Sequence, residues 1–433
     1  MRQELIRPGA SELSYEIREI VKKADQLKAL GETIYWENIG DPIQKNAQIP
    51  SWIKDIVSDL SQTDKAYGYS HSLGIKEVRE FLAKRNNQLQ GAQISEEDII
   101  FFNGLGDGIS TLYQFINPTS RIIGPSPAYS THSSGEAAHA NADPLTYVLK
   151  PSRKWLPDID DLYNQVMYNQ SIVGILIINP DNPTGMVYPE ETLIEIIDIA
   201  RQFDLFIISD EIYGAITYNG AKHFALSEII EDVPGVALKG MSKDVPWPGS
   251  RCGWMEFYNR GSDRIFNNLF NTLASAKMME VCSTTLPQMA IPKIYGDPRF
   301  PAYRHKENEK IGKRSELITE LLGDLPQLYF NPTQGAFYNT IVFKPGILNN
   351  KQSLKIGNPE IEPLLENWLS EPNIKADKRF VYYLLATKGV CVVPISSFCS
   401  DLMGFRVTLL EENEELLLET FTRIKEAVIE YCP

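Results

Sequence analysis

Apolar and polar positions along the middle of the chain predict short buried strands separated by helices. Five apolar runs each end in a polar or glycine-rich loop, at 98–104, 120–127, 173–180, 204–211 and 235–243. Between two of these runs, Leu193, Ile196 and Ala200 share one face of a predicted helix over 190–203. Strands that alternate with helices are typical of a mostly parallel sheet covered on both faces. The pattern therefore predicts a large α/β domain.

The two ends of the chain carry helical patterns instead. Apolar residues at helical spacing predict one amphipathic helix over 14–30 and another over 412–431. A polar stretch rich in turn-forming residues, 344–363, predicts a loop. Because the chain exceeds the size at which one core suffices, we expect two domains. The large domain would span 46–310, and a smaller one would combine 1–45 with 311–433.

The composition indicates a globular protein with an acidic balance. The 433 residues are 43% hydrophobic, and 56 Asp and Glu against 42 Lys and Arg give a net charge of -14. This sign disfavours binding to a phosphate backbone, so we expect no nucleic-acid partner. The first residues lack an apolar signal core, and no apolar run approaches the ~20 residues of a membrane helix. We therefore expect a cytoplasmic protein with no membrane partner.

Neither the cysteines nor the histidines are spaced like metal ligands. The five cysteines show neither the paired spacing of a zinc site nor a disulfide framework. The histidines form no ligand cluster, at His71, His132, His139, His223 and His305. We therefore expect reduced thiols and no metal site, and we assign the histidines no chemistry.

Candidate chemistry follows the predicted strands directly. Ligands of open α/β sheets bind outside the carboxyl ends of the strands. The glycine-rich stretch GLGDGIS opens a predicted helix, where free backbone N–H groups and the helix dipole favour a phosphate. Asp210 and Tyr213 follow another strand, and Lys243 and Arg251 follow the last one. In IINPDNPTGMVY, two Asn-Pro steps stiffen the backbone at a strand end.

Together these stretches resemble the pyridoxal-phosphate site of the class I/II (fold type I) aminotransferases. The resemblance rests on NPDNPTG, SDEIYG and GMSKDVPWPGSRCGW, in this order. It extends over nearly the whole chain through YGYSHSLGIKEVRE, GPSPAYSTH, NPTQGAFY and GVCVVPISSFCSDLMGFRVTLLE. It implies a large domain with a mostly parallel seven-stranded sheet between helices, and a smaller α/β domain built from both chain ends. It also implies pyridoxal 5'-phosphate as the cofactor, with amino acids and 2-oxo acids as substrates.

The resemblance assigns roles to four residues around the cofactor ring. Lys243 would form the Schiff base and act as the general base. Asp210 would keep the ring nitrogen protonated, which lets the ring stabilise a carbanion at the substrate. Tyr213 and Asn182 would donate to the ring oxygen and lower the pKa of the Schiff base. The Asn-Pro steps would aim Asn182, and Asn182–Pro183 is a candidate for a cis bond.

The remaining contacts also follow from the resemblance. The cofactor phosphate would lie on the backbone of Gly104, Leu105 and Gly106, beside Ser242 and Arg251. Tyr129 would stack on the ring, and Tyr69 would reach the phosphate from the second subunit of a homodimer. The substrate α-carboxylate would form a bidentate contact with Arg406. Gly40 and Asn182 would complete that carboxylate site.

Each role has a simpler alternative. Asp210 could merely cap the following helix. Tyr69 and Tyr129 could be packing residues, as aromatic residues near turns often are. Arg406 could be an ordinary ion-pair residue at a strand end. Lysines in loops are generally solvated surface charges, but Lys243 follows a buried strand within a full motif.

Two other activities and the substrate stay open. A β-lyase or a decarboxylase uses the same scaffold, since the reactions differ in which bond is broken. An effector-sensing domain of a transcription regulator would need a basic extension, whereas this chain is acidic. The stretch 276–288 offers no arginine for a second carboxylate, and Glu280 would repel one. Tyr35 and Trp36 either favour an apolar substrate or pack against the small domain, so we expect a neutral amino acid as donor.

Overall fold

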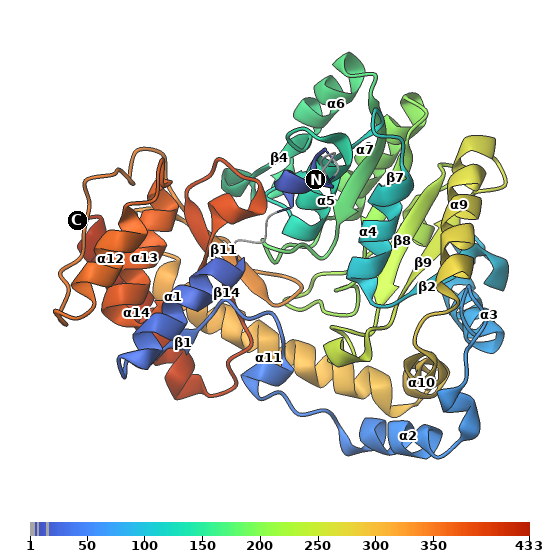
Figure 1. Cartoon of the computed structure of the whole chain (residues 1–433), viewed down its shortest axis with the longest axis horizontal. Coiled ribbons are helices and arrows are strands. Elements are labelled where there is room, and N and C mark those ends of the chain that lie inside the picture. Colours follow the sequence, from blue (N-terminus) through green and yellow to red (C-terminus); the bar gives the residue numbers. More distant parts are fainter. Residues whose placement is uncertain (1–4, 7, 14–16) are drawn as a thin grey trace.

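The computed structural model describes residues 5–6, 8–13 and 17–433, which form two lobes (Figure 1). One lobe contains a large sheet between helices. The other combines the C-terminal part of the chain with α1 (Ile17–Ala29) and β1 (Tyr35–Trp36). The predicted start of α1, at 14–16, lies outside the described residues.

The large sheet has the expected, mostly parallel topology. Its strand order is β2-β9-β8-β7-β6-β3-β4-β5. Neighbours from β8 to β4 run parallel, whereas β9 is antiparallel to both β2 and β8. The sheet has eight strands rather than seven, because the two-residue β5 pairs antiparallel with β4 at one edge. The bounds are β2 Ile99–Phe102, β3 Arg121–Ser126, β4 Thr146–Lys150, β5 Leu156–Pro157, β6 Ile172–Ile178, β7 Phe206–Asp210, β8 Gly235–Gly240 and β9 Gly253–Tyr258.

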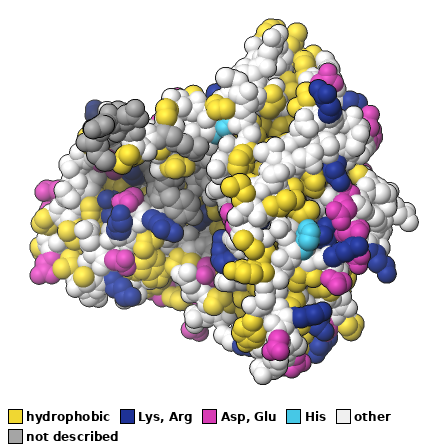
Figure 2. Space-filling model, turned by 45° about the vertical axis from the view of Figure 1, so that its right-hand side comes forward, with side chains coloured by type: hydrophobic (Ala, Val, Ile, Leu, Met, Phe, Trp, Pro, Cys, Tyr) yellow, Lys and Arg dark blue, Asp and Glu magenta, His cyan; other side chains and the backbone are white. Residues whose placement is uncertain are grey.

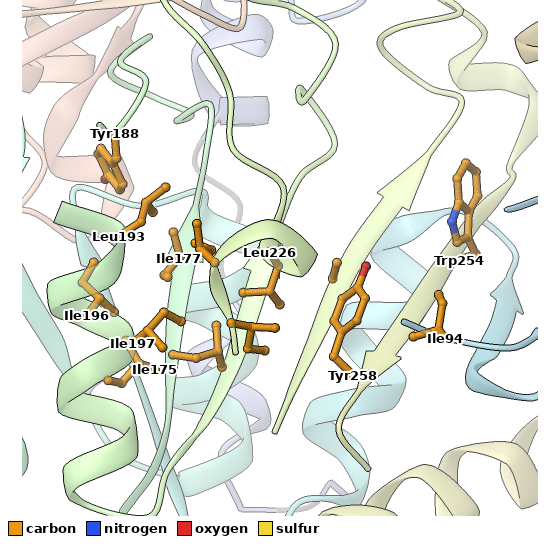
Figure 3. Packing of buried hydrophobic residues seen from close by; sticks show 14 of the residues in the cluster. Ile94, Ile175, Ile177, Tyr188, Leu193, Ile196, Ile197, Leu226, Trp254 and Tyr258 are labelled. Carbon is orange, nitrogen blue, oxygen red and sulfur yellow. The ribbon is translucent and has the colours of Figure 1, made fainter. Parts of the chain in front are cut away.

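Helices cover both faces of this sheet, which explains the unbroken apolar runs of its strands. In β6, Ile175 and Ile177 pack on one face, whereas Leu176 and Ile178 pack on the other. Figure 3 shows the first face, where Leu193 and other residues of α7 lie against the strands. The helices of this lobe are α2 Ser51–Ser61, α3 Lys76–Asn87, α4 Leu105–Phe115, α5 Ser130–Ala140, α6 Ile159–Tyr168, α7 Glu190–Gln202, α8 Leu226–Ile229, α9 Arg264–Glu280 and α10 Thr285–Tyr295.

The second lobe joins α1 and the C-terminal part of the chain around one core. Ile20, Ala24 and Leu27 of α1 belong to the same buried cluster as Phe421 and Ile424 of α14. An antiparallel sheet of order β10-β11-β14-β13 lies in this lobe, and β1 pairs parallel with β12. The bounds are β10 Leu328–Tyr329, β11 Tyr338–Phe343, β12 Val390–Cys391, β13 Val393–Pro394, β14 Gly404–Thr408, α12 Glu362–Leu369, α13 Ala376–Lys388 and α14 Glu414–Tyr431.

The lobes are joined by α11 (Arg299–Leu322), a helix of 24 residues that runs along the base of both (Figure 1). Phe300 near its start is buried with the large sheet, and Ile318 near its end is buried in the second lobe. The domain boundaries at 45/46 and 310/311 stay predictions. Short 3-10 helices lie at Ala10–Glu12, Ile43–Lys45, Asp64–Tyr67, Glu96–Asp98, Pro151–Arg153, Pro248–Ser250 and Ile395–Phe398.

The structure answers two local questions, on the loop at 344–363 and on the position of Tyr35 and Trp36. The predicted loop at 344–363 is confirmed up to α12, and it buries Leu354 and Ile361 in the second lobe. Tyr35 and Trp36 form β1 and pack against the core of the second lobe, instead of lining the substrate side of the site. The Tyr35 hydroxyl donates to Glu419 of α14 at 2.7 Å. The packing alternative is therefore correct for Tyr35, because pairing with β12 turns this segment toward α14.

The surface mixes charges of both signs. On the face seen in Figure 2, acidic, basic and apolar side chains are interspersed. Within the described part of the chain, none of the helices has both the length and the apolar character needed to cross a membrane.

Candidate active site

Three loops leave the large sheet side by side because of strand register. Asp210, the last residue of β7, lies opposite Ile178 of β6 and Leu238 of β8. The backbone N–H of Asn179 donates to the Asp210 carbonyl at 3.1 Å. The sequence motifs that follow β6, β7 and β8 are therefore brought to one edge of the sheet, as expected for an open α/β fold.

Asp210 is a buried carboxylate with two partners. Its side chain is only 3% exposed. Oδ1 accepts the backbone N–H of Ile212 at 3.1 Å, which is the local turn contact that the capping alternative anticipates. Oδ2 lies 3.0 Å from Nε2 of His132. The carboxylate is thus held in place from two directions inside the protein.

His132 is a site residue that sequence reasoning missed. From the sequence we assigned it no chemistry, because the five histidines form no ligand cluster. It stands on α5, 78 residues from Asp210 along the chain, and its side chain is fully buried. Only the packing of α5 against the strand ends brings the imidazole to the carboxylate. The available signal was its place in GPSPAYSTH, three residues after Tyr129.

Lys243 lies where the two lobes meet. Its Nζ donates to the backbone carbonyl of Gly40 at 2.8 Å. The same nitrogen lies 5.8 Å from the ring centroid of Tyr213 and 5.5 Å from that of Phe337. Lys243 is therefore not an ordinary solvated surface charge, because its amine is hydrogen-bonded to the backbone of the other lobe and lies near two aromatic rings.

Tyr213 is buried and keeps its proton. Its hydroxyl oxygen lies 3.0 Å from the hydroxyl oxygen of Tyr338 on β11. Burial raises the pKa of Tyr213 well above its ordinary value, and the neighbouring Tyr338 adds to this effect. A protonated hydroxyl at this position is a hydrogen-bond donor for a ligand.

Arg406 is a buried guanidinium with spare donors. It is 3% exposed, its Nη2 donates to the carbonyl of Asn38 at 2.7 Å, and its Nη1 lies 3.5 Å from Oδ1 of Asn182. Its Cζ lies 4.4 Å from the ring centroid of Tyr338 and 5.1 Å from that of Phe398. Its Nε has no hydrogen-bond partner among the described residues, which is unusual for a buried donor. This arrangement fits a ligand carboxylate better than the ion-pair alternative, since no described carboxylate pairs with Arg406.

A buried ion pair holds the segment that carries Asn38 and Gly40. Nζ of Lys45 lies 2.9 Å from Oε1 of Glu37, and the Thr408 hydroxyl donates to Oε2 of Glu37 at 2.7 Å. The side chains of Glu37 and Lys45 are 1% and 7% exposed. The pair therefore fastens both ends of the segment 37–45 and ties it to β14, the strand of Arg406. No local sequence motif predicts this ion pair.

The start of α4 forms a cradle for an anion. Gly104 has a φ of +87°, and a Cβ there would lie 2.4 Å from Nη2 of Arg251, so only glycine fits. A Cβ at Gly106 would meet no atom within 4 Å. Free N–H groups at the first turn of this helix and the guanidinium beside Gly104 attract negative charge. Ser242, 9% exposed, precedes Lys243 at the start of the loop that follows β8.

The other two aromatic candidates lie in different surroundings. The ring of Tyr129, at the N-cap of α5, lies 6.5 Å from the ring of His132, the partner of Asp210. Tyr69 is 87% exposed. Its neighbour Gly68 accepts a hydrogen bond from the Thr285 hydroxyl at 2.8 Å. Within a single chain, the Tyr69 side chain extends into solvent instead of into the site.

The NPDNPTG loop joins both lobes at Asn182. The Thr340 hydroxyl of β11 donates to the Pro183 carbonyl at 2.8 Å. The cis bond in this loop is Asn179–Pro180, and Asn182–Pro183 is not cis, contrary to our candidate. Asp181 is completely buried, and burial raises its pKa to about 7. Its Oδ2 accepts the N–H of Thr184, whereas its Oδ1 has no partner among the described residues.

Glu280 lies on the phosphate side of the site. Its carboxylate accepts hydrogen bonds from Asn103 and from the buried Lys277. Its charge is thus largely compensated, so the repulsion that we expected from it toward a second substrate carboxylate is weakened.

The residues present fit pyridoxal phosphate. A buried carboxylate at Asp210 suits a protonated ring nitrogen, and Tyr213 offers a donor for a ring oxygen. The cradle at Gly104 and Arg251 suits the phosphate, and Lys243 offers an amine. The unpartnered Nε of Arg406 suits a substrate carboxylate.

Comparisons with known proteins agree with this chemistry. The family model described as "Aminotransferase class I and II" matches residues 38–420. An uncharacterised aminotransferase of Methanocaldococcus jannaschii is 50% identical over 431 residues, which cover 100% of this chain and 99% of that protein. The glutamate-pyruvate aminotransferase of Haemophilus influenzae is 33% identical over 325 residues, or 71% of this chain and 76% of the relative. The solved alanine aminotransferase of Pyrococcus furiosus is 26% identical, with a TM-score of 0.85 over 98% of this chain and 100% of that one.

Proposed function

Because the chain belongs to the class I and II aminotransferases, which use pyridoxal phosphate to move an amino group between an amino acid and a 2-oxo acid, we propose that Lys243 tethers the cofactor and acts as the general base. One observation carries this proposal. The Lys243 amine lies at the junction of the two lobes, 2.8 Å from the Gly40 carbonyl and beside Tyr213. It is thus within reach of groups suited to the cofactor and of groups suited to the substrate.

Residues around the ring adjust its electronic state. When bound, pyridoxal phosphate supplies an electron sink for the negative charge that develops at the substrate α-carbon. Asp210 holds a proton at the ring nitrogen, and His132 keeps the carboxylate oriented through its 3.0 Å contact. Tyr213 and Asn182 donate to the ring oxygen. Together these four residues favour the charge distribution that the reaction needs.

The remaining residues bind and orient. The first turn of α4 and Arg251 hold the phosphate, and Tyr129 covers one face of the ring. Arg406 binds the α-carboxylate with two parallel N–H groups, supported by Asn182 and the Gly40 backbone. With the substrate fixed at that end, Nζ of Lys243 removes the proton from the α-carbon, so one residue serves as both tether and base.

We infer that the preferred amino donor is a small neutral amino acid, with alanine as the first candidate. The relatives named above include a glutamate-pyruvate aminotransferase and an alanine aminotransferase. Phe398 and Tyr338 flank Arg406 with aromatic surfaces, which favours an apolar side chain near the carboxylate. Glutamate is the candidate for the second amino acid, from the name of the Haemophilus relative.

We also propose a two-fold homodimer in which Tyr69 reaches the phosphate of the other subunit. The side chains of Tyr69 and Met279 are 87% and 90% exposed, and the second subunit would cover them. The segment that carries Tyr69 lies next to the turn at 283–285, and Thr284 of that turn donates to the Arg251 carbonyl at 3.2 Å. The contact surface and the phosphate cradle are thus adjacent.

Single-turnover measurements test the substrate and the reaction together. The enzyme loaded with pyridoxal phosphate is mixed separately with alanine, leucine, methionine, phenylalanine, aspartate and glutamate, and the cofactor absorbance is followed. Conversion to the aminated cofactor, fastest with alanine, supports the proposal. Faster conversion with aspartate than with every neutral amino acid contradicts the substrate class. Release of pyruvate with ammonia contradicts transamination and indicates elimination.

A further inference from the structure

Tyr338 lies between three residues to which we assign roles, although no role was assigned to it from the sequence. It is the first residue of β11 and is 3% exposed. Its hydroxyl lies 3.0 Å from that of Tyr213, and its ring lies 4.4 Å below the guanidinium of Arg406. A Cβ at Gly40 would lie 2.2 Å from the Tyr338 hydroxyl oxygen, so this hydroxyl also touches the Gly40 backbone.

Strand pairing explains this position. β11 and β14 are antiparallel, with Tyr338 opposite Thr408 and Thr340 opposite Arg406. Tyr338 and Arg406 are therefore diagonal neighbours on one face of the sheet, within reach of each other. Burial and the contact with Arg406 restrict the ring, and its hydroxyl lies toward Tyr213.

A bound ligand determines which of the two hydroxyls, Tyr213 or Tyr338, donates to the other. Each hydroxyl has one proton, and in the protein alone either oxygen can be the donor of the 3.0 Å bond. An anionic ring oxygen accepts hydrogen bonds and donates none, so it takes the proton of Tyr213. Tyr213 can then only accept from Tyr338. A chain in which each hydroxyl donates to the next polarises both bonds in the same direction.

We propose that Tyr338 is a positioning residue, whose hydroxyl donates to Tyr213 and thereby directs the Tyr213 proton to the cofactor ring oxygen. This inference rests on the proposed roles of Lys243 and Tyr213. It adds that one side chain of the small domain fixes a donor on the cofactor side through its hydroxyl and the substrate-binding Arg406 through its ring. Removing the hydroxyl should therefore shift the pH at which the absorbance of the bound cofactor changes. Removing the ring should in addition weaken substrate binding.

The first experiment titrates the visible absorbance of the loaded enzyme against pH. Tyr338→Phe removes the hydroxyl and keeps the ring. A ring oxygen with a less well oriented donor is less stable as an anion, so the pH midpoint of the absorbance change should rise by about 0.5–1 pH unit. Tyr218→Phe is the matched control: Tyr218 is buried, and its hydroxyl donates to Thr333 at 2.9 Å, away from the site. The control should leave the midpoint unchanged.

A double-mutant cycle shows whether the effect passes through Tyr213. In a Tyr213→Phe background, Tyr338→Phe should produce no further change in the midpoint, because the hydroxyl through which it acts is gone. An unchanged midpoint in the single Tyr338→Phe variant overturns the proposal. So does an equal rise in the Tyr213→Phe background, or an equal rise in Tyr218→Phe.

Substrate binding separates the ring from the hydroxyl. Tyr338→Phe should leave the KM for alanine within about twofold, whereas Tyr338→Leu should raise it by about tenfold because Arg406 loses its aromatic support. Equal KM values for the two variants contradict the role of the ring. The proposed function is tested separately. If the wild-type protein shows no pH-dependent absorbance band that Lys243→Ala abolishes, the Lys243 assignment fails, regardless of Tyr338.

Discussion

The cofactor side of the site and the substrate side differ in how far apart their residues stand in the chain. Asp210, Tyr213 and Lys243 follow neighbouring strands, whose register already brings their loops together. Arg406 is held by the carbonyl of Asn38, which is 368 residues away along the chain. One side is thus built by a single sheet, whereas the other is assembled from both chain ends.

This difference teaches which changes each side tolerates. β7 pairs with β6 on one side and with β8 on the other, so the position of Asp210 depends on a large sheet and its core. The segment that carries Asn38 and Gly40 is held by side-chain contacts instead, among them the buried pair Glu37–Lys45 and its contact with Thr408. We expect substitutions in the small domain to affect mainly substrate binding. Substitutions at the strand ends should affect mainly cofactor binding.

Lys243→Ala tests the point where the two sides meet and should have the largest effect. Turnover should fall by about 10³-fold or more, since the tether and the general base are both removed. The protein should remain folded and bind pyridoxal phosphate without a bond that borohydride can reduce. Measurements are the steady-state rate and the mass of the reduced protein, with the exposed Lys313→Ala on α11 as control. Near-normal turnover with a reducible covalent adduct would show that Lys243 is not the tether.

Asp181→Asn tests the loop that carries Asn182 to both sides. Burial raises the pKa of Asp181 to about 7, above its value in the unfolded chain. The stability that this carboxyl contributes is therefore complete below about pH 4 and is lost as the pH rises through about 7. Asparagine does not ionise, so near pH 8 the variant should be more stable than the wild type by about 3 kcal/mol.

Denaturant unfolding at pH 5 and at pH 8 checks this prediction, and the exposed Asp324→Asn serves as control. The difference in stability between variant and wild type should grow with pH for Asp181→Asn only. A difference of the same size at both pH values would mean that Asp181 does not titrate in this range.

Arg406→Lys sharpens the comparison on the substrate side. Lysine keeps the charge but cannot reproduce two parallel N–H groups, so kcat/KM for alanine should fall by about 10- to 100-fold. Cofactor affinity should stay unchanged, because Arg406 belongs to the other side. Arg423→Lys, at a partly exposed arginine of α14 that pairs with Glu419, is the control. If the loss appears in the dissociation constant of pyridoxal phosphate instead, the separation of the two sides is wrong.

Tyr69→Phe has the smallest expected effect and concerns the cofactor side alone. If Tyr69 donates to the phosphate of the other subunit, the affinity for pyridoxal phosphate should fall by about 5- to 10-fold, the equivalent of one hydrogen bond. Tyr168→Phe, at another exposed tyrosine, should have no effect. Sedimentation should show a dimer for both variants. A fully active wild-type monomer would remove the basis for this contact.

The apolar runs and motifs of the sequence determined much of the large domain. All five predicted strands are present as β2, β3, β6, β7 and β8, because each is a short apolar run bounded by turn-forming residues. The motifs after these strands also indicated Asp210, Tyr213 and Lys243. Catalytic groups at strand ends are recognisable in a sequence, since both the strand and the motif are local.

Only the tertiary structure decided the contacts between distant segments. The partnership of His132 with Asp210, the hydrogen bond between Tyr213 and Tyr338, and the buried pair Glu37–Lys45 join residues with no common local pattern. The sequence also left open whether Tyr35 faces the substrate or the small domain, and pairing of β1 with β12 decided this. Local patterns determine strands, helices and turns. Most of these contacts join residues far apart in the sequence, so they depend on how distant segments pack in the folded chain.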